Sequence, residues 1–185
     1  VVKAGPKGEW HCQPDNGTFD LWFNGKNLFP DSGSYIYAGP GEVQKMRDWF
    51  RQTCVHNTLT FDNKNLETTE SKTLLWQPDG NQQVLVTQNP SYKDLDHRRT
   101  VFFVDQTYYV IVDEALGSAT GNLNLHYLLT DGKTSAEKNT IRTDYKGESN
   151  VMIACNSASP MELKQEEGWY STAYRKKTAR PSRKG

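Results

Sequence analysis

Four polar side chains in the first third of the chain have the types needed for proton transfer or for binding a metal ion. His11 and Gln13 lie two residues apart in a polar segment, Asp31 follows in a predicted turn, and His56 stands at the start of a predicted strand. An imidazole exchanges protons close to neutral pH, since its unperturbed pKa is about 6.5. If the strand ends converge, these residues predict an acid–base centre or a divalent cation site. The alternative is that they only satisfy the hydrogen bonds of turns.

The elements that must position these residues are almost all short β-strands. Segments rich in β-branched and aromatic residues alternate in polarity with period two, and turn signals such as Asn24-Gly25 separate them. The predicted strands are 18–23, 33–37, 56–61, 84–87, 99–104, 108–112, 123–129, 140–143 and 151–155. Only Glu42 to Arg51 suits a helix, of one or two turns. This pattern predicts an all-β fold, either a sandwich or a barrel.

The charges are unevenly distributed along the 185 residues. The chain carries 22 basic and 22 acidic side chains, but residues 175–185 hold six of the basic ones and no acid, so residues 1–174 have a net charge of −6. A negative body opposes nucleic-acid binding, and no apolar run approaches the roughly 20 residues of a membrane helix. We therefore expect neither nucleic acid nor membrane as a partner, and we expect 175–185 to be a flexible basic tail.

Several segments resemble a known family of polysaccharide lyases. The strings 7–19, 28–35 and 51–58, which contain Trp10-His11-Cys12-Gln13 and Pro30-Asp31-Ser32-Gly33, are similar to the C-terminal domain of the heparinase II/III-like family, and specifically to its heparinase III branch. The later segments 96–104 and 109–114 fit the same family's sandwich strands. The resemblance covers most of the chain up to the basic tail.

This resemblance implies an antiparallel β-sandwich domain over residues 1–174, a fragment of a larger enzyme in which an α/α toroid precedes the sandwich. Members cleave heparan sulfate by β-elimination: the C5 proton of a hexuronate is removed, and the departing C4 oxygen is protonated without water. The implied partners are a sulfated glycosaminoglycan substrate and the toroid domain of the same chain, in the periplasm of a bacterium or secreted from it. Two alternatives stay open: a non-catalytic carbohydrate-binding or structural sandwich, and a lyase for another uronate polymer such as alginate.

The resemblance also implies a role for each of the four polar residues. His11 takes the position of the catalytic histidine, and Gln13, Asp31 and His56 take the positions of ligands for one structural metal ion. The family's tyrosine and asparagine partners come from the toroid, so we expect the isolated chain to be inactive. Heparinase II has a histidine where this chain has Gln13, and a harder donor set leaves either calcium or zinc as the expected ion.

The two remaining histidines are expected to have no functional role. His97, beside Arg98 and Arg99, is expected on a solvated strand edge, and His126, between Leu125 and Tyr127, is expected to be a structural histidine with its hydrogen bonds satisfied. The surface that faces the toroid is expected to be unusually apolar.

Overall fold

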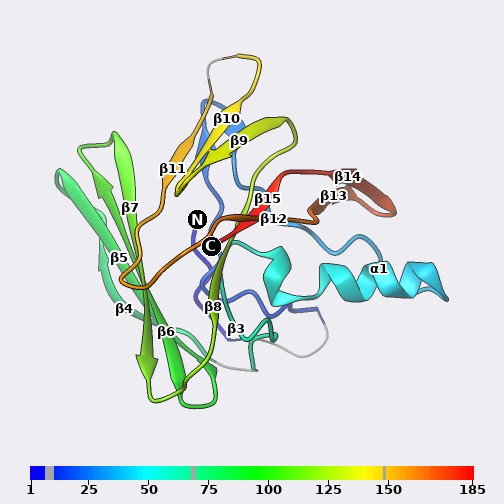
Figure 1. Ribbon diagram of the computed structural model, residues 1–185, viewed down its shortest axis with the longest axis horizontal. Helices are drawn as coiled ribbons and strands as arrows, with labels where there is room; N and C mark the ends of the chain where they lie inside the picture. Colours follow the sequence, from blue (N-terminus) through cyan, green and yellow to red (C-terminus); the bar gives the residue numbers. More distant parts are fainter. Residues whose placement is uncertain (7–10, 68–69, 148) are drawn as a thin grey trace.

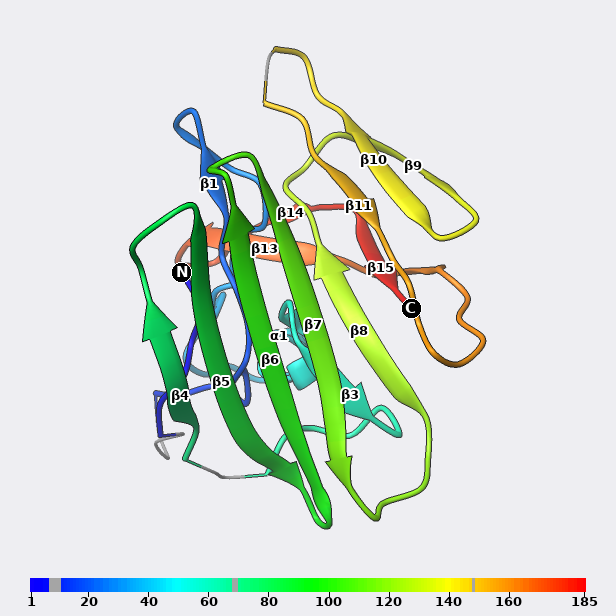
Figure 2. The same ribbon diagram turned by 90° about the vertical axis from the view of Figure 1, so that its left-hand side faces the viewer.

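Antiparallel β-strands form most of the regular structure of this chain. The computed structural model describes residues 1–6, 11–67, 70–147 and 149–185. Within these residues, two four-stranded sheets are accompanied by three smaller sheets and one α-helix (Figures 1 and 2). The antiparallel all-β sandwich expected for this chain is confirmed. None of the described helices is long and apolar enough to cross a membrane.

The first four-stranded sheet is a meander in which neighbours in sequence are neighbours in space. Its strands, in order, are β4 (Lys72–Gln77), β5 (Gln82–Tyr92), β6 (Leu95–Val104) and β7 (Tyr108–Gly117). The β6–β7 hairpin keeps one register from Val104 opposite Tyr108 to Leu95 opposite Gly117. The hairpin predicted around residues 99–112 is therefore confirmed, and it is longer than expected.

The second four-stranded sheet joins the end of the chain to its middle. Its strands, in order, are β12 (Lys164–Glu166), β15 (Ser182–Lys184), β8 (Leu123–Leu128) and β3 (Leu59–Phe61). The smaller sheets consist of β1 (Trp22–Phe23) with β2 (Lys26–Asn27), of β9 (Lys133–Glu137), β10 (Thr140–Asp144) and β11 (Met152–Ala154), and of β13 (Trp169–Ala173) with β14 (Lys176–Ala179).

The helix α1 (Glu42–Phe50) lies on the side of the molecule opposite the β4–β7 sheet (Figure 1). Its last residue, Phe50, is completely buried and stacks on Tyr35 with the ring centroids 5.4 Å apart. A short 3-10 helix, η1 (Thr53–Val55), follows and leads to His56. The helix predicted from Glu42 is confirmed, and Phe50 fixes the end that carries the chain to the site.

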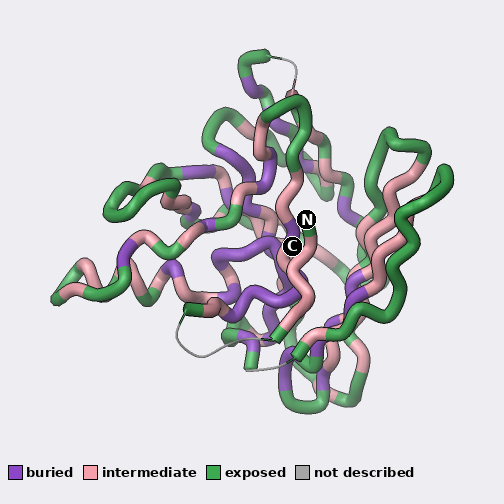
Figure 3. The backbone as a smooth tube through the Cα atoms, turned by 180° about the vertical axis from the view of Figure 1, so that it is seen from behind, coloured by how far each residue is buried: buried purple, intermediate pink, exposed green. Residues whose placement is uncertain are grey.

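Two clusters of buried apolar side chains hold the layers together. The first consists of Phe19, Leu28, Phe29, Leu129, Ile141 and Tyr145, and Ile111 of β7 packs against it. The second joins β3 to the ends of β5 and β6 through Leu59, Phe61, Leu66, Tyr92 and Leu95. In Figure 3 the buried backbone accordingly gathers in the middle of the molecule.

The β4–β7 sheet carries apolar side chains on both faces. Side chains alternate between the faces along a strand, so Val86 and Val112 share one face while Leu85, Val101 and Ile111 share the other. Large apolar side chains on the edge strands are exposed, namely Leu74, Leu75, Trp76, Tyr108, Tyr109, Val110 and Val112. An exposed apolar area of this kind indicates a surface that another layer covers.

The expected strand at residues 33–37 is wrong. Gly33 and Tyr35 both have positive φ, at 74° and 58°, and an extended strand requires negative φ throughout. The segment is irregular because the Asp31 carboxylate accepts the N–H of Gly33 and so closes a tight turn.

The expected flexible tail over residues 175–185 is also corrected. Its residues form β14 and β15, and Ser182 pairs with Leu128 of β8. Arg180 is buried and donates hydrogen bonds to the carbonyl of Pro30 and to the hydroxyl of Ser32. Lys184 also pairs with Glu166, so specific contacts within the fold order this basic segment.

Candidate metal and acid–base site

Asp31 and His56, which the sequence places in one site, are in contact. Asp31 Oδ2 lies 2.9 Å from His56 Nδ1, and Asp31 Oδ1 accepts the N–H of Gly33 at 2.7 Å. The imidazole of His56 is buried, whereas the carboxylate of Asp31 is partly exposed. Oxygen and nitrogen ligands lie about 2.0–2.2 Å from zinc, so two atoms 2.9 Å apart can bind one ion together.

Gln13 approaches this pair through the loop that follows Asp31. Its Nε2 donates to the carbonyl of Gly33 at 3.0 Å, which leaves Oε1 buried and without a hydrogen-bond partner among the described residues. The Nδ1 atom of His56, which faces Asp31, is the ring nitrogen placed to bind the same ion. Buried polar atoms normally have partners, and an amide oxygen and an imidazole nitrogen are both metal ligands. The residues present therefore fit a bound cation.

The carboxylate of Asp31 is ionised at neutral pH. Burial would raise the pKa of this group, but the hydrogen bond and charge of His56, the N–H of Gly33 and the charge of Arg180 together lower it to about 2. A deprotonated carboxylate is the form that binds a cation.

The structure adds Asp15 to the three predicted ligands. Its carboxylate, that of Asp31 and the imidazole of His56 offer ligand atoms that all lie within 4.8 Å of one another. Asp15 is buried and forms an ion pair with Lys3. Sequence reasoning missed this residue, although it follows Gln13 at a spacing of two.

His11 lies apart from this cluster, in an open pocket of about 100 Å³. The pocket is lined by His11, Gln13, Ser34, Ile36, Tyr37, Arg47 and Arg51. His11 is exposed, and the edge of its ring meets Tyr37 with the centroids 5.8 Å apart and the planes at 82°. Gln13 lines this pocket and also donates to the loop that follows Asp31, at Gly33.

A buried set of polar contacts, here termed the Arg99 hub, ties both loops of the site to the β4–β7 sheet. Arg99 pairs with Asp113 through two nitrogens, at 2.7 and 3.1 Å. It also donates to the carbonyls of Gly17 and Asn57, the latter at 2.7 Å. Because Gly17 follows Asp15 closely and Asn57 follows His56, one guanidinium fixes the two loops that hold the cation site.

The Arg99 hub corrects the expectation of a solvated edge at residues 97–99. His97 and Arg99 are only 1% and 2% exposed, because the loops at Gly17 and Asn57 pack against the face of the sheet that carries their side chains. His97 Nε2 lies 2.6 Å from Asp113. Burial lowers the pKa of His97, and the charges of Arg99 and His97 hold the pKa of Asp113 well below its usual range against the opposing effect of burial.

His126 is a structural histidine, as expected. Its Nε2 lies 2.8 Å from the hydroxyl of Thr60, and its Nδ1 lies 2.7 Å from the carboxylate of Glu166. Both ring nitrogens are therefore satisfied inside the fold, and neither is open to a substrate.

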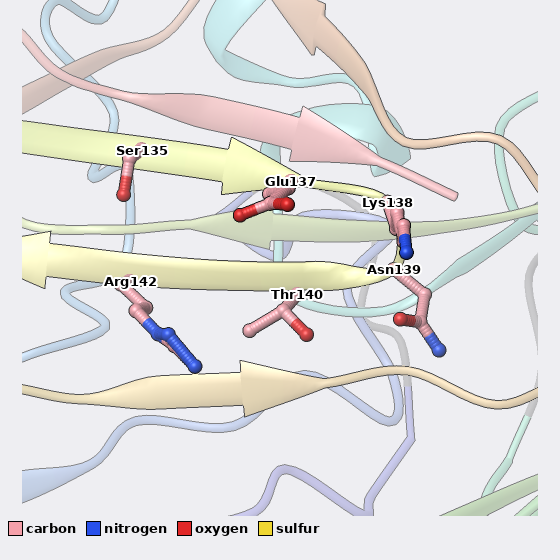
Figure 4. A pocket seen from close by; sticks show the side chains of 6 residues that line it. All are labelled: Ser135, Glu137, Lys138, Asn139, Thr140 and Arg142. Atoms are coloured by element: carbon pink, nitrogen blue, oxygen red, sulfur yellow. The ribbon is translucent and has the colours of Figure 1, made fainter.

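A second pocket, of about 220 Å³, lies on the β9–β10 hairpin (Figure 4). Its lining residues are Ser135, Glu137, Lys138, Asn139, Thr140 and Arg142, none of which belongs to the predicted site. It offers no histidine, and so lacks the group that exchanges protons near neutral pH.

Comparison with known proteins places these features in a family. The model of the C-terminal domain of heparinase II/III-like proteins matches residues 1–183. A heparin-sulfate lyase of Bacteroides stercoris is 63% identical over 97% of this chain and 27% of its own length. A heparin-sulfate lyase of Pedobacter heparinus is 42% identical over 98% of this chain and 28% of its own length.

Solved structures show the same relationship in three dimensions. A heparinase III structure superposes on the whole chain with a TM-score of 0.96 at 62% identity, and this match covers 29% of that structure. The structure of the Pedobacter heparinus heparan sulfate lyase gives a TM-score of 0.95 at 42% identity and also covers 29% of the solved chain. The chain thus spans less than a third of the length of the relatives it matches. The chain therefore belongs to the heparinase II/III-like family and corresponds to the C-terminal domain of its members.

Proposed function

We propose that this chain is the sandwich part of a longer polysaccharide lyase that cleaves heparan sulfate by β-elimination at uronic acid residues. The observation that carries the proposal is an exposed imidazole, His11, in a pocket whose lining includes Gln13, one of the proposed ligands of the candidate cation site. The relatives named as heparin-sulfate lyases support this substrate class. They are more than three times as long as the matched region, which leaves room for an α/α toroid as the partner domain.

In this proposal His11 moves a proton at the reacting uronate. The C5–H bond breaks and its electron pair forms the double bond to C4, while the C4–O bond breaks and the leaving oxygen takes up a proton. An imidazole suits this exchange because its pKa lies near working pH. His11 is exposed and lines this pocket, so we assign it as the acid–base group that this chain supplies.

The cation site has a structural role in this proposal. Gln13, Asp31 and His56 are the proposed ligands, and Asp15 completes the donor set from the same loop as Gln13. A bound calcium or zinc ion would cross-link segments that are distant in sequence. Because Gln13 lies in both the pocket and this site, holding it in place also holds the loop that presents His11.

The exposed apolar side chains of β4 and β7 support the proposal that a further part of a longer chain covers this domain. These side chains lie away from the His11 pocket, because the β4–β7 sheet is on the side of the molecule opposite α1, the helix that borders the pocket. We also propose a periplasmic or secreted location, since the proposed substrate is an extracellular polymer; fractionation of producing cells would test it.

The substrate class can be tested with the full-length lyase and a panel of polymers. The product of β-elimination absorbs at the band of an unsaturated uronate, so each polymer reports cleavage directly. We expect the band to grow with heparan sulfate. If the band grows with alginate alone, the substrate is alginate and not heparan sulfate. If the band grows with none of the uronate polymers, the protein is not a lyase, and a carbohydrate-binding module is favoured.

A further inference from the structure

The pocket around His11 has a charge opposite to that of the chain as a whole. Arg47 and Arg51 line it together with His11, and no carboxylate is found among its described lining residues. Residues 1–174 carry a net charge of −6, so two guanidinium groups in one small pocket stand out from their surroundings. A local positive potential of this kind attracts an anionic ligand.

Arg47 lies within α1, and Arg51 directly follows the last residue of that helix. They lie four residues apart, which places them next to each other on a helix. Arg47 donates its Nε to the carbonyl of Tyr37, and Arg51 donates an N–H to the carbonyl of Cys12 at 3.3 Å. These contacts hold both guanidinium groups against the segments that flank His11.

The guanidinium of Arg47 can bind an anion in place of its contact with Asp48, because that contact is weak. A guanidinium has five N–H donors in a planar fork. Besides the carbonyl of Tyr37, Arg47 contacts the neighbouring Asp48. The Asp48 carboxylate lies 3.6 Å from Nη1 of Arg47, and its side chain is 59% exposed. Exposed ion pairs contribute little free energy, so an anion that binds two N–H groups at once can displace this contact.

We propose that Arg47 and Arg51 form an anion subsite of the His11 pocket, which binds a carboxylate or sulfate group of a uronate polysaccharide. The subsite positions the polymer so that a neighbouring uronate reaches the imidazole of His11. This inference rests on the proposed lyase function and adds residues that bind the substrate without moving a proton.

The test uses Arg47→Gln and Arg47→Lys in the full-length lyase, with Lys45→Gln as the matched control. Lys45 lies on the same helix, but its side chain is 73% exposed, pairs with Glu42 and lies outside the pocket lining. For Arg47→Gln we expect KM to rise about tenfold or more with kcat within about threefold of wild type. Arg47→Lys should recover part of this loss, because it restores the charge without the planar fork. Lys45→Gln should match wild type.

Two arms of the same experiment identify the anion. If KM rises equally on an unsulfated heparan backbone, the bound group is the carboxylate, and if it rises only on sulfated polymer, the group is a sulfate. A fall in kcat at unchanged KM, on both polymers, would show that Arg47 only supports the backbone at Tyr37 and would overturn the proposal. So would an equal rise in KM for Lys45→Gln.

Failure of the subsite can be separated from failure of the lyase proposal by direct binding. Titration of a sulfated heparan oligosaccharide into full-length His11→Ala, with and without Arg47→Gln, requires no turnover. Weaker binding with Arg47→Gln supports the subsite even if no polymer is cleaved. Unchanged binding contradicts it even if the lyase is active.

Discussion

At the scale of single residues, His11 and His56 are distinguished by burial and not by sequence. His11 is exposed beside Tyr37, whereas His56 is buried against Asp31. An exposed imidazole can contact a sugar, and a buried one beside a carboxylate can bind an ion together with it. The structure therefore supports different roles for two residues of the same type.

We expect His11→Ala in the full-length lyase to lower kcat about 10²–10⁴-fold, the range typical for loss of an acid–base group. Its metal content should stay at the wild-type level, because His11 lies outside the Asp15–Asp31–His56 cluster. Turnover and elemental analysis of the same preparation measure both quantities. Loss of metal in proportion to loss of turnover would make His11 a ligand.

We expect His56→Ala to weaken metal binding by more than about tenfold and to lower the melting temperature, since the ion links separate loops. His126→Ala is the matched control, because His126 is equally buried but has both ring nitrogens hydrogen-bonded within the fold. That variant should lose stability but keep its metal. Retention of the full metal content by His56→Ala would remove His56 from the ligand set.

At the scale of elements, the long-range contacts of β6 hold the site together. The Arg99 hub joins β6 and β7 to the carbonyls of Gly17 and Asn57, which lie 82 and 42 residues away in sequence. Gly17 has a φ of 83°, and a side chain there would collide with Thr58 and His97. The loop that carries the site is thus packed directly on the sheet.

We expect Arg99→Met to lower the free energy of unfolding by about 3–5 kcal/mol, because it leaves the buried carboxylate of Asp113 without its main partner. Arg98→Met is the control, since Arg98 is the neighbour of Arg99 on β6 but forms a partly exposed ion pair with Glu114 of β7. That substitution should change stability little. Denaturant unfolding measures the free energy of unfolding of both variants. Equal losses of this free energy would show that the Arg99 hub stabilises the fold no more than a surface ion pair does.

The acid dependence of this contact follows from the low pKa of Asp113. An unfolded aspartate takes up its proton near pH 3.9, whereas Asp113 in the fold holds its negative charge to a lower pH beside Arg99 and His97. The stabilisation is fully present above about pH 5 and is lost as the pH falls toward the folded pKa. The difference in stability between wild type and Asp113→Asn should therefore narrow between about pH 5 and pH 3, and a difference that widens would contradict this.

The sequence predicts the elements that have strong local patterns. It does not predict burial or order that depends on contacts between residues far apart in the chain. Period-two alternation and a turn predict the β6–β7 hairpin, and Phe50 closes a helix predicted from Glu42. The burial of Arg99 and the order of residues 176–184 depend on acceptors far away in sequence, which no local pattern contains. For the same reason His56 and Asp31 could be proposed as partners only through the family resemblance.

At the scale of the whole molecule, the site lies at one side of the fold, and we propose that a further part of a longer chain completes it. Among the described residues, the His11 pocket offers one imidazole, two guanidinium groups and a tyrosine already engaged with His11. On the opposite side, the β4–β7 sheet exposes apolar side chains on both edge strands. Both surfaces are consistent with a domain that works within a longer chain.

The most direct test of this account is the rate of unsaturated uronate formation from heparan sulfate by residues 1–185 alone and by the full-length lyase. Circular dichroism and metal content should first establish that the shorter chain is folded. We predict product formation by the full-length protein and none by the folded shorter chain, because His11 needs a second acid–base group from the rest of the protein. Turnover by residues 1–185 alone would show that a complete active site lies within them and would contradict the account.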